Sequence, residues 1–161
     1  MVKTQIIVGV SDAKVSRDPS DLIVTYSLGS CIGVCLYDAV AHVGGMLHYQ
    51  LPDSKSNPER AQENPFMFAD TGLKRLVRKL ESLGAKKKLL HVKIAGGAAM
   101  NTGPKGFDIG KRNCLAIRKL LWKYGMFLDT EEVGGFSARS LYLDIEDGTV
   151  SMRSNGREKT L

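Results

Sequence analysis

The sequence predicts a fold of the α+β type, with a single compact layered domain, largely antiparallel or mixed sheets and two main flanking helices. Three observations predict it. Short segments of alternating apolar and polar residues recur along the chain, which is typical of antiparallel strands. Two longer segments carry apolar residues at helical spacing. Finally, 161 residues with 43% hydrophobic and 25% charged side chains suit one globular domain with its own core.

Eight segments are expected to form strands, because each combines β-branched and other apolar residues with turn residues nearby. They are residues 5–10, 21–27, 31–38, 41–50, 89–95, 126–133, 141–145 and 150–152. The polar segments between these strands lack any such period and are expected to be loops. Two of these loops span residues 11–20 and 54–64.

Two segments are expected to be helices. The first begins at Pro65 with Asn64 as its cap, where the missing N–H of proline removes no helical hydrogen bond, and it ends before Gly84. The second runs from about Ile109 to Tyr124. Its inward side chains are expected to be Ile109, Cys114, Ile117, Leu121 and Tyr124.

The C-terminal part of the chain predicts a hairpin. A tight turn at Asp147–Gly148 would pair Ile145 with Val150 on an apolar face. The last residues, from about 154 to 161, are expected to be a frayed tail. Because the sequence contains no internal repeat and no linker, residues 1–161 are expected to form one domain.

Charge and composition argue against several classes of function. The formal net charge is +6, but lysine and arginine are spread along the chain, with one short cluster at Lys86–Lys88. Such a spread mildly favours an acidic protein partner through long-range attraction. Nucleic-acid binding would require basic residues interleaved with exposed aromatic residues, or a recognisable module, so no nucleic-acid partner is expected.

Membrane insertion and metal binding are not expected either. No apolar run approaches the roughly 18 residues that span a bilayer. The N-terminal residues are too polar for a signal peptide, so a cytoplasmic location is expected. The three cysteines are odd in number and lack the spacing of metal ligands, which argues against a disulfide framework and a zinc site.

A thiol and an imidazole are predicted to meet on two adjacent strands. A symmetric loop centred on Ala39–Val40 places Cys31 directly opposite His48, with the apolar residues of both strands on the other face. Gly33 and Gly44 would then leave open space nearby. A thiol beside an imidazole is the minimal set of groups for nucleophilic catalysis by cysteine.

A purely structural explanation stays open for these two residues. Free cysteines are among the most buried residue types, and a histidine in a strand often packs within a sheet. The loop sequence Ala39–Val40 also lacks the asparagine and glycine that two-residue hairpins favour, so a longer symmetric loop is expected. A one-residue bulge would remove the pairing altogether.

Thr25 is a candidate third member of the site. A turn centred on Leu28 would set Thr25 beside Cys31, where its hydroxyl or carbonyl group could hold the imidazole in one orientation. The alternative is that threonine occurs here simply because it is a good strand residue.

Several motifs together resemble those of the CheD family, the chemoreceptor glutamine deamidases of bacterial and archaeal chemotaxis. The resemblance covers nearly the whole chain. It rests on Thr25 followed by Leu28-Gly29-Ser30-Cys31, on Gly44-Gly45-Met46-Leu47-His48, on the segments KIAGGAAM (93–100) and IGKRN (109–113), and on Val133-Gly134-Gly135. Ala138 before Arg139 departs from the expected Gly-Arg, far along the chain from Cys31.

The resemblance implies that Cys31 is the catalytic nucleophile, His48 the base and Thr25 its support. It implies deamidation of selected receptor glutamines to glutamates, without a metal or cofactor. The backbone N–H groups near Ser30 and Cys31 are candidates for holding the oxyanion. Further candidates on the oxyanion or substrate side are Ser27, Gly33 and Gly44.

The resemblance also implies partners, namely the cytoplasmic helices of chemoreceptors as substrate and a CheC-type phosphatase as a possible partner. A monomer is expected. The same chemistry could hydrolyse a glutamyl methyl ester. Two other functions stay open, a non-catalytic chemotaxis adaptor that binds receptors or the phosphatase, and a cysteine peptidase with the same nucleophile.

Overall fold

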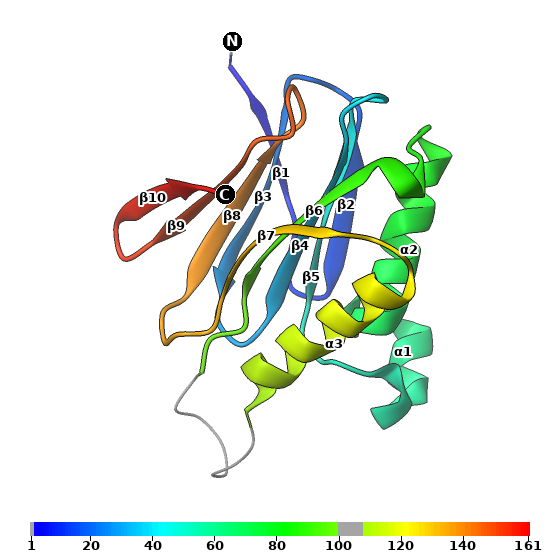
Figure 1. Ribbon diagram of the computed structural model, residues 1–161. Helices are drawn as coiled ribbons and strands as arrows, with labels where there is room; N and C mark the ends of the chain where they lie inside the picture. Colours follow the sequence, from blue (N-terminus) through cyan, green and yellow to red (C-terminus); the bar gives the residue numbers. More distant parts are fainter. Residues whose placement is uncertain (1, 100–107) are drawn as a thin grey trace.

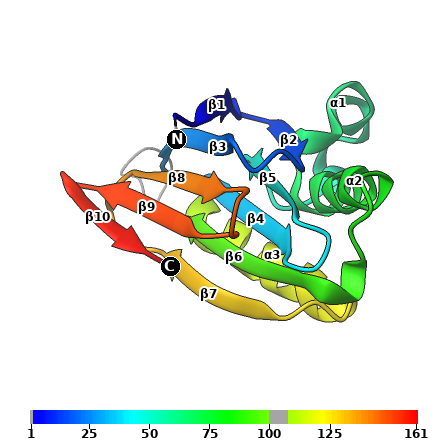
Figure 2. The same ribbon diagram turned by 90° about the horizontal axis from the view of Figure 1, so that it is seen from above.

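The computed structural model describes residues 2–99 and 108–161. In these residues two five-stranded sheets lie face to face, and the longer helices cover the outer face of one of them (Figures 1 and 2). The first sheet has the order β1 (Thr4–Ile7), β3 (Asp21–Leu28), β8 (Arg139–Asp144), β9 (Val150–Ser154) and β10 (Arg157–Thr160). The second has the order β2 (Asp12–Ser16), β5 (Val43–Tyr49), β4 (Ile32–Asp38), β6 (Leu90–Gly96) and β7 (Leu128–Val133).

The helices are α1 (Pro58–Glu63), α2 (Ala69–Ser82) and α3 (Ile109–Lys123). Helices α2 and α3 pack on the second sheet, and α3 connects the parallel strands β6 and β7. The α+β class, the mixed sheets and the two main flanking helices are therefore confirmed. None of the helices in the described residues is long and apolar enough to cross a lipid bilayer.

The second sheet is the middle layer, so its central strands are buried on both faces. Every residue of β4 and β5 is buried. Because side chains alternate along a strand, one set faces the helices and the other faces the first sheet. In β5, Leu47 and Tyr49 belong to the helix-side core, whereas Met46 packs between the sheets. His48 has the same parity as Met46 and therefore also points towards the first sheet.

Four expectations about individual elements are wrong. Helix α2 begins at Ala69, because Pro65–Met67 forms a separate 3-10 turn capped by Asn64. The expected loop 54–64 contains α1, and the expected loop before residue 20 contains β2. The expected frayed tail forms β10, which pairs antiparallel with β9.

The hairpin of β4 and β5 has a different register from the expected one. Asp38 pairs with Val43, which shifts every pair by two residues and places Gly33, not Cys31, opposite His48. The loop has four residues because the Asp38 carboxylate accepts two backbone N–H groups within it, and because His42 adopts a positive φ of 55°.

The register of the hairpin of β8 and β9 also differs by two residues from the expected one, in the opposite direction. Leu143, rather than Ile145, pairs with Val150. Ile145 does not pair with β9. Its N–H donates to the backbone carbonyl of Asp21 in β3, and its own carbonyl accepts from the Tyr37 hydroxyl. The turn is therefore longer than the expected two-residue turn.

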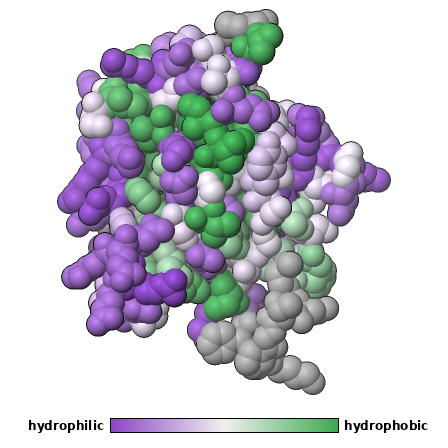
Figure 3. All heavy atoms as spheres, turned by 180° about the vertical axis from the view of Figure 1, so that it is seen from behind, coloured by the Kyte–Doolittle hydropathy of each residue, from purple (hydrophilic) through white to green (hydrophobic). Residues whose placement is uncertain are grey.

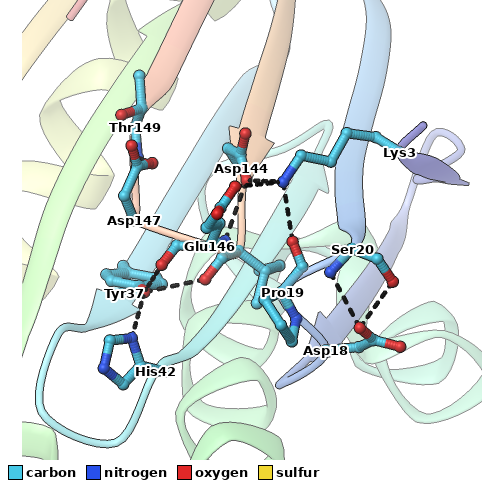
Figure 4. A network of polar contacts seen from close by, with 11 residues as sticks. Lys3, Asp18, Pro19, Ser20, Tyr37, His42, Asp144, Glu146, Asp147 and Thr149 are labelled. Atoms are coloured by element: carbon cyan, nitrogen blue, oxygen red, sulfur yellow. Dashed lines mark hydrogen bonds and ion pairs between the residues drawn. The ribbon is translucent and has the colours of Figure 1, made fainter. Parts of the chain in front are cut away.

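Figure 4 shows the polar contacts that close this end of the molecule. The Lys3 ammonium group pairs with Asp144 at 3.1 Å and with Glu146 at 2.8 Å, which ties the N-terminus to the end of β8. The Tyr37 hydroxyl donates to the Ile145 carbonyl at 2.9 Å and lies 3.3 Å from Nδ1 of His42. His42 precedes β5 and His48 lies near its other end, so this network and His48 occupy opposite ends of the sandwich.

Candidate active site

His48 and Thr25 meet in the space between the two sheets. His48 comes from β5 in the second sheet and Thr25 from β3 in the first, and their side chains are 1% and 0% exposed. The Thr25 Oγ1 lies 2.7 Å from Nδ1 of His48 and donates to the carbonyl of Val8 at 2.8 Å. Stacking of the sheets therefore assembles this pair.

The hydrogen-bond pattern sets the tautomer of the imidazole. The single hydroxyl proton of Thr25 goes to the Val8 carbonyl, so Oγ1 must accept from His48, whose Nδ1 carries the proton. The lone pair of the neutral ring then lies on Nε2, which is buried and has no hydrogen-bond partner among the described residues. Burial lowers the pKa of His48 to about 4, against a smaller opposing effect of the Asp12 carboxylate. His48 is therefore a neutral base with a free Nε2.

Cys31 lies just before β4, on the same side of the sheet as His48. Gly33 is the residue opposite His48, and Cys31 precedes it by two positions, so Cys31 and His48 are diagonal neighbours. Such neighbours lie about 7–8 Å apart between Cα atoms, which long side chains can bridge. The thiol is half-buried, and burial raises the pKa of Cys31, while its own backbone N–H lowers it to a smaller extent.

The expected placement of the three residues was only partly right. The direct pairing of Cys31 with His48 is wrong, but a shift of two residues keeps both on one face. The expected turn that would set Thr25 beside Cys31 is also wrong, because β3 and β4 belong to different sheets. The threonine hydroxyl contacts the imidazole all the same, from across the interface between the sheets.

The backbone around the thiol is held by three hydrogen bonds in succession. The carbonyl groups of Gly29, Ser30 and Cys31 accept from Ala98 N–H at 2.8 Å, from the Asn113 side chain at 2.9 Å and from Gly97 N–H at 2.9 Å, respectively. These three carbonyl groups point towards β6 and α3. Because the carbonyl and the N–H of one trans peptide point in opposite directions, the N–H groups between them point away from β6 and α3. Among the described residues, the N–H of Ser30 has no acceptor.

Asn113 is not among the residues expected at the site, although the sequence contains a signal for it. Asn113 lies four residues after Ile109 and four before Ile117, and both were expected on the inward side of the helix. A side-chain amide on a buried helical stripe is uncommon without partners that satisfy it. Asn113 is fully buried, and its Nδ2 donates to two carbonyl groups, whereas its Oδ1 has no partner among the described residues.

The other expected site residues lie elsewhere or are covered. Ser27 is exposed, has a φ of 58° and lines a hollow of about 310 Å³ on the first sheet, beside Ser140 and Asn155. Gly33 and Gly44 do not leave open space. A methyl group at Gly33 would lie 2.7 Å from Leu141, and the side chains of the first sheet fill the position of Gly44 in the same way.

The chain offers no competing thiol or metal site in its described part. Cys35 is buried between the sheets, and burial raises its pKa to about 12, against a small opposing effect of Lys93. Cys114 lies on the buried side of α3, and burial raises its pKa too. No group of three or more histidine, cysteine or acidic side chains among the described residues could hold a metal ion.

Comparisons with known proteins give a consistent family. Residues 50–154 match the family model described as CheD chemotactic sensory transduction. The probable chemoreceptor glutamine deamidase CheD of Solibacter usitatus (strain Ellin6076) is 50% identical over 98% of this chain and 93% of its own. The chemoreceptor glutamine deamidase CheD of Thermotoga maritima (strain ATCC 43589) is 43% identical over 93% of this chain and 92% of its own.

A solved structure shares the fold. The crystal structure of Neisseria meningitidis protein NMB0706, of family DUF152, superposes with a TM-score of 0.50 and 11% identity, over 83% of this chain and 63% of its own. That likeness concerns the fold alone. The family follows from the full-length relatives and the family model, and this chain belongs to the CheD family.

Proposed function

We propose that this chain is a protein-glutamine deamidase that converts selected glutamines of chemoreceptors to glutamates, with Cys31 as nucleophile, His48 as base and Thr25 as its orienting group. The names of its full-length relatives support the reaction and the substrate. The observation that carries the assignment of residues is the Thr25–His48 hydrogen bond, which leaves a neutral Nε2 free on the face that also carries Cys31.

The reaction begins with a proton transfer. Nε2 of His48 takes the proton of the Cys31 thiol, and the sulfur attacks the side-chain carbonyl carbon of the glutamine. The carbonyl oxygen becomes an oxyanion as the carbon–sulfur bond forms. When this intermediate collapses, the carbon–nitrogen bond breaks, and His48 delivers its proton to the departing nitrogen, which leaves as ammonia.

A water molecule completes the cycle. His48 takes a proton from the water, and the resulting hydroxide attacks the thioester carbon. The carbon–sulfur bond breaks, the glutamate is released, and the proton returns to Cys31. The N–H groups of Ser30 and Cys31 are the proposed oxyanion donors, since the carbonyl groups of this loop are already bonded on its other side.

The surface near the site supports a protein substrate. On the side where Figure 2 shows the edge strands β1 and β2, apolar atoms form a band through the surface with polar atoms around it (Figure 3). Ile7 and Val10 are exposed apolar residues, and they flank Val8, whose carbonyl group holds Thr25. An apolar surface of this kind suits the apolar face of an amphipathic helix.

The proposal extends to the setting of the reaction. The chain would act in the cytoplasm on receptor helices as a monomer, with a CheC-type phosphatase as a partner, and the same thioester chemistry would also hydrolyse a glutamyl methyl ester. A non-catalytic adaptor is the alternative. The retained thiol, free imidazole nitrogen and orienting hydroxyl favour the enzyme.

Intact-mass spectrometry of a receptor cytoplasmic fragment tests the proposal. With the wild-type chain, we expect the mass gain of an amide-to-acid exchange at each modified glutamine. Cys31→Ala should lower the rate by roughly 10³-fold or more, since it removes the nucleophile. His48→Gln should lower it by about 10²–10⁴-fold, since it removes the base.

The matched control is Cys35→Ala, which removes a buried thiol that points between the sheets, and it should retain activity. A receptor cut into peptides would indicate a peptidase, and an unchanged receptor mass would indicate an adaptor. If Cys35→Ala were inactive and Cys31→Ala active, the nucleophile would be assigned to the wrong strand position.

A further inference from the structure

The Asn113 side chain in α3 joins two segments that are distant in sequence. Its Nδ2 donates one hydrogen to the Ser30 carbonyl at 2.9 Å and the other to the Gln50 carbonyl at 2.8 Å. Ser30 directly precedes Cys31, and Gln50 follows His48 by two residues. A single fully buried amide therefore spans the strand ends that carry the thiol and the imidazole.

A second contact fixes the helix at the same point. The hydroxyl of Tyr49, the residue after His48, donates to the backbone carbonyl of Asn113 at 2.6 Å. Tyr49 is fully buried as well. Asn113 is thus held by its main chain and holds two other main-chain groups through its side chain, so its position relative to β4 and β5 is set from both sides.

The bond to Ser30 also determines where the N–H of Cys31 points. The carbonyl of Ser30 and the N–H of Cys31 belong to one peptide plane, and in a trans peptide they point in opposite directions. The described residues contain no cis peptide. Because Asn113 draws the Ser30 carbonyl towards α3, the Cys31 N–H is directed away from α3, where it stabilises a charged sulfur.

We propose that Asn113 is a positioning residue, which holds the Ser30–Cys31 peptide and the strand after His48 in the arrangement that the reaction uses. The inference rests on the proposed function of Cys31 and His48 and adds a third layer, helix α3, to that site. Asn113 itself does not contact the glutamine. It acts on the N–H group that faces the sulfur and the oxyanion.

Alkylation of Cys31 measured against pH tests this role without any receptor. Iodoacetamide reacts with the thiolate, and peptide mapping identifies Cys31 among the three cysteines. In Asn113→Ala we expect the midpoint of the pH profile to rise by about one pH unit, because the Cys31 N–H is no longer directed at the sulfur. Asn113→Ser is too short to reach both carbonyl groups and should shift it in the same direction.

Receptor deamidation by the same variants supplies the second measurement. We expect kcat to fall by about 10–100-fold while KM changes by less than about twofold, since the variants alter the transition state and leave the substrate surface in place. The control is Ile117→Val, one turn further along the buried side of α3, which weakens packing without contact to Ser30 or Gln50.

The two measurements separate the possible failures. If both Asn113 variants show the same alkylation profile and the same kcat as the control Ile117→Val, Asn113 has only a structural role and the inference is overturned. If the wild-type chain leaves the receptor mass unchanged, the deamidase proposal fails, and the alkylation profiles alone decide whether Asn113 positions the thiol.

Discussion

At the level of single residues, the site combines two groups whose environments both favour the uncharged form. Burial raises the pKa of Cys31 and lowers that of His48. The resting site therefore holds a thiol and a neutral imidazole rather than a thiolate–imidazolium ion pair. In the proposed mechanism the thiolate, which is the reactive form, appears only when His48 takes the proton of Cys31.

Burial of a neutral His48 predicts an acid-dependent loss of stability. Its pKa is about 4 in the folded chain and near 6.5 when exposed, so the unfolded chain binds a proton at higher pH than the folded one. The stabilisation is complete above pH 6.5 and is lost as the pH falls towards 4. We expect the unfolding free energy of the wild type to drop by about 3 kcal/mol more than that of His48→Gln over this interval.

Urea unfolding at a series of pH values measures this difference. His42→Gln is the matched control, because His42 is exposed in the loop before β5. Its pH dependence should follow that of the wild type. Parallel curves for the wild type and His48→Gln would show that the buried imidazole does not carry the acid sensitivity.

At the level of elements, the sequence predicts which face a residue occupies better than which partner it meets. Alternation correctly placed the apolar residues of β4 and β5 on one face, which in the structure meets the helices, and Cys31 with His48 on the other. Register depends on the loop, and nothing in the apolar pattern reveals that Asp38 accepts two N–H groups there. A shift of two residues preserves the faces and changes every pair.

The contact between α3 and the strand β6 offers an element-level test. Gly110, in the first turn of α3, lies against Gly97 and Ala98, which bind the carbonyl groups of Cys31 and Gly29. A methyl group at Gly110 would collide with the backbone carbonyl oxygens of Gly97 and Ala98. Alanine gains up to about 1 kcal/mol in helix propensity, but such overpacking costs about 1–3 kcal/mol.

We therefore expect Gly110→Ala to lower the free energy of unfolding and the deamidation rate together. The control is Gly72→Ala in α2, where the added methyl would lie 3.0 Å from the end of the Leu47 side chain and 3.5 Å from the Cα atom of Phe66, and would not strike a carbonyl oxygen. That variant should be neutral to within about 1 kcal/mol. Chemical denaturation of both variants measures the difference, and a Gly110→Ala protein at least as stable and active as the wild type would refute the close approach.

At the level of the whole molecule, the proposed site lies where three layers meet. Thr25 belongs to the first sheet, His48 to the second and Asn113 to the helix layer. The sequence identified Thr25 and His48 as residues of interest through chemistry and family resemblance. It did not reveal that they lie in different sheets, because the chain turns sharply between β3 and β4, and such a turn is equally compatible with a hairpin.

The distance between the sheets depends on glycines in the second sheet that face leucines in the first. A methyl group at Gly33, opposite His48, would lie 2.7 Å from Leu141 and 3.0 Å from Leu28. We expect Gly33→Ala to push the sheets apart near the Thr25–His48 bond, and to cost about 1–3 kcal/mol of stability with a loss of activity.

Removal of the opposing atom should reverse part of this loss. Leu141→Val deletes the carbon atom that the methyl group of Gly33→Ala would strike. The loss of unfolding free energy in the double variant should therefore be smaller than the sum of the two single losses by at least about 0.5 kcal/mol. The double variant should also be more active than Gly33→Ala alone. Gly44→Ala is the matched control. It meets Ile145 and Tyr37 at the other end of β5, so its effect should add to that of Leu141→Val within about 0.5 kcal/mol and should spare the activity. If the stability effects of Gly33→Ala and Leu141→Val also add within about 0.5 kcal/mol, as expected for Gly44→Ala, the sheet spacing at Leu141 does not control the contact between Thr25 and His48.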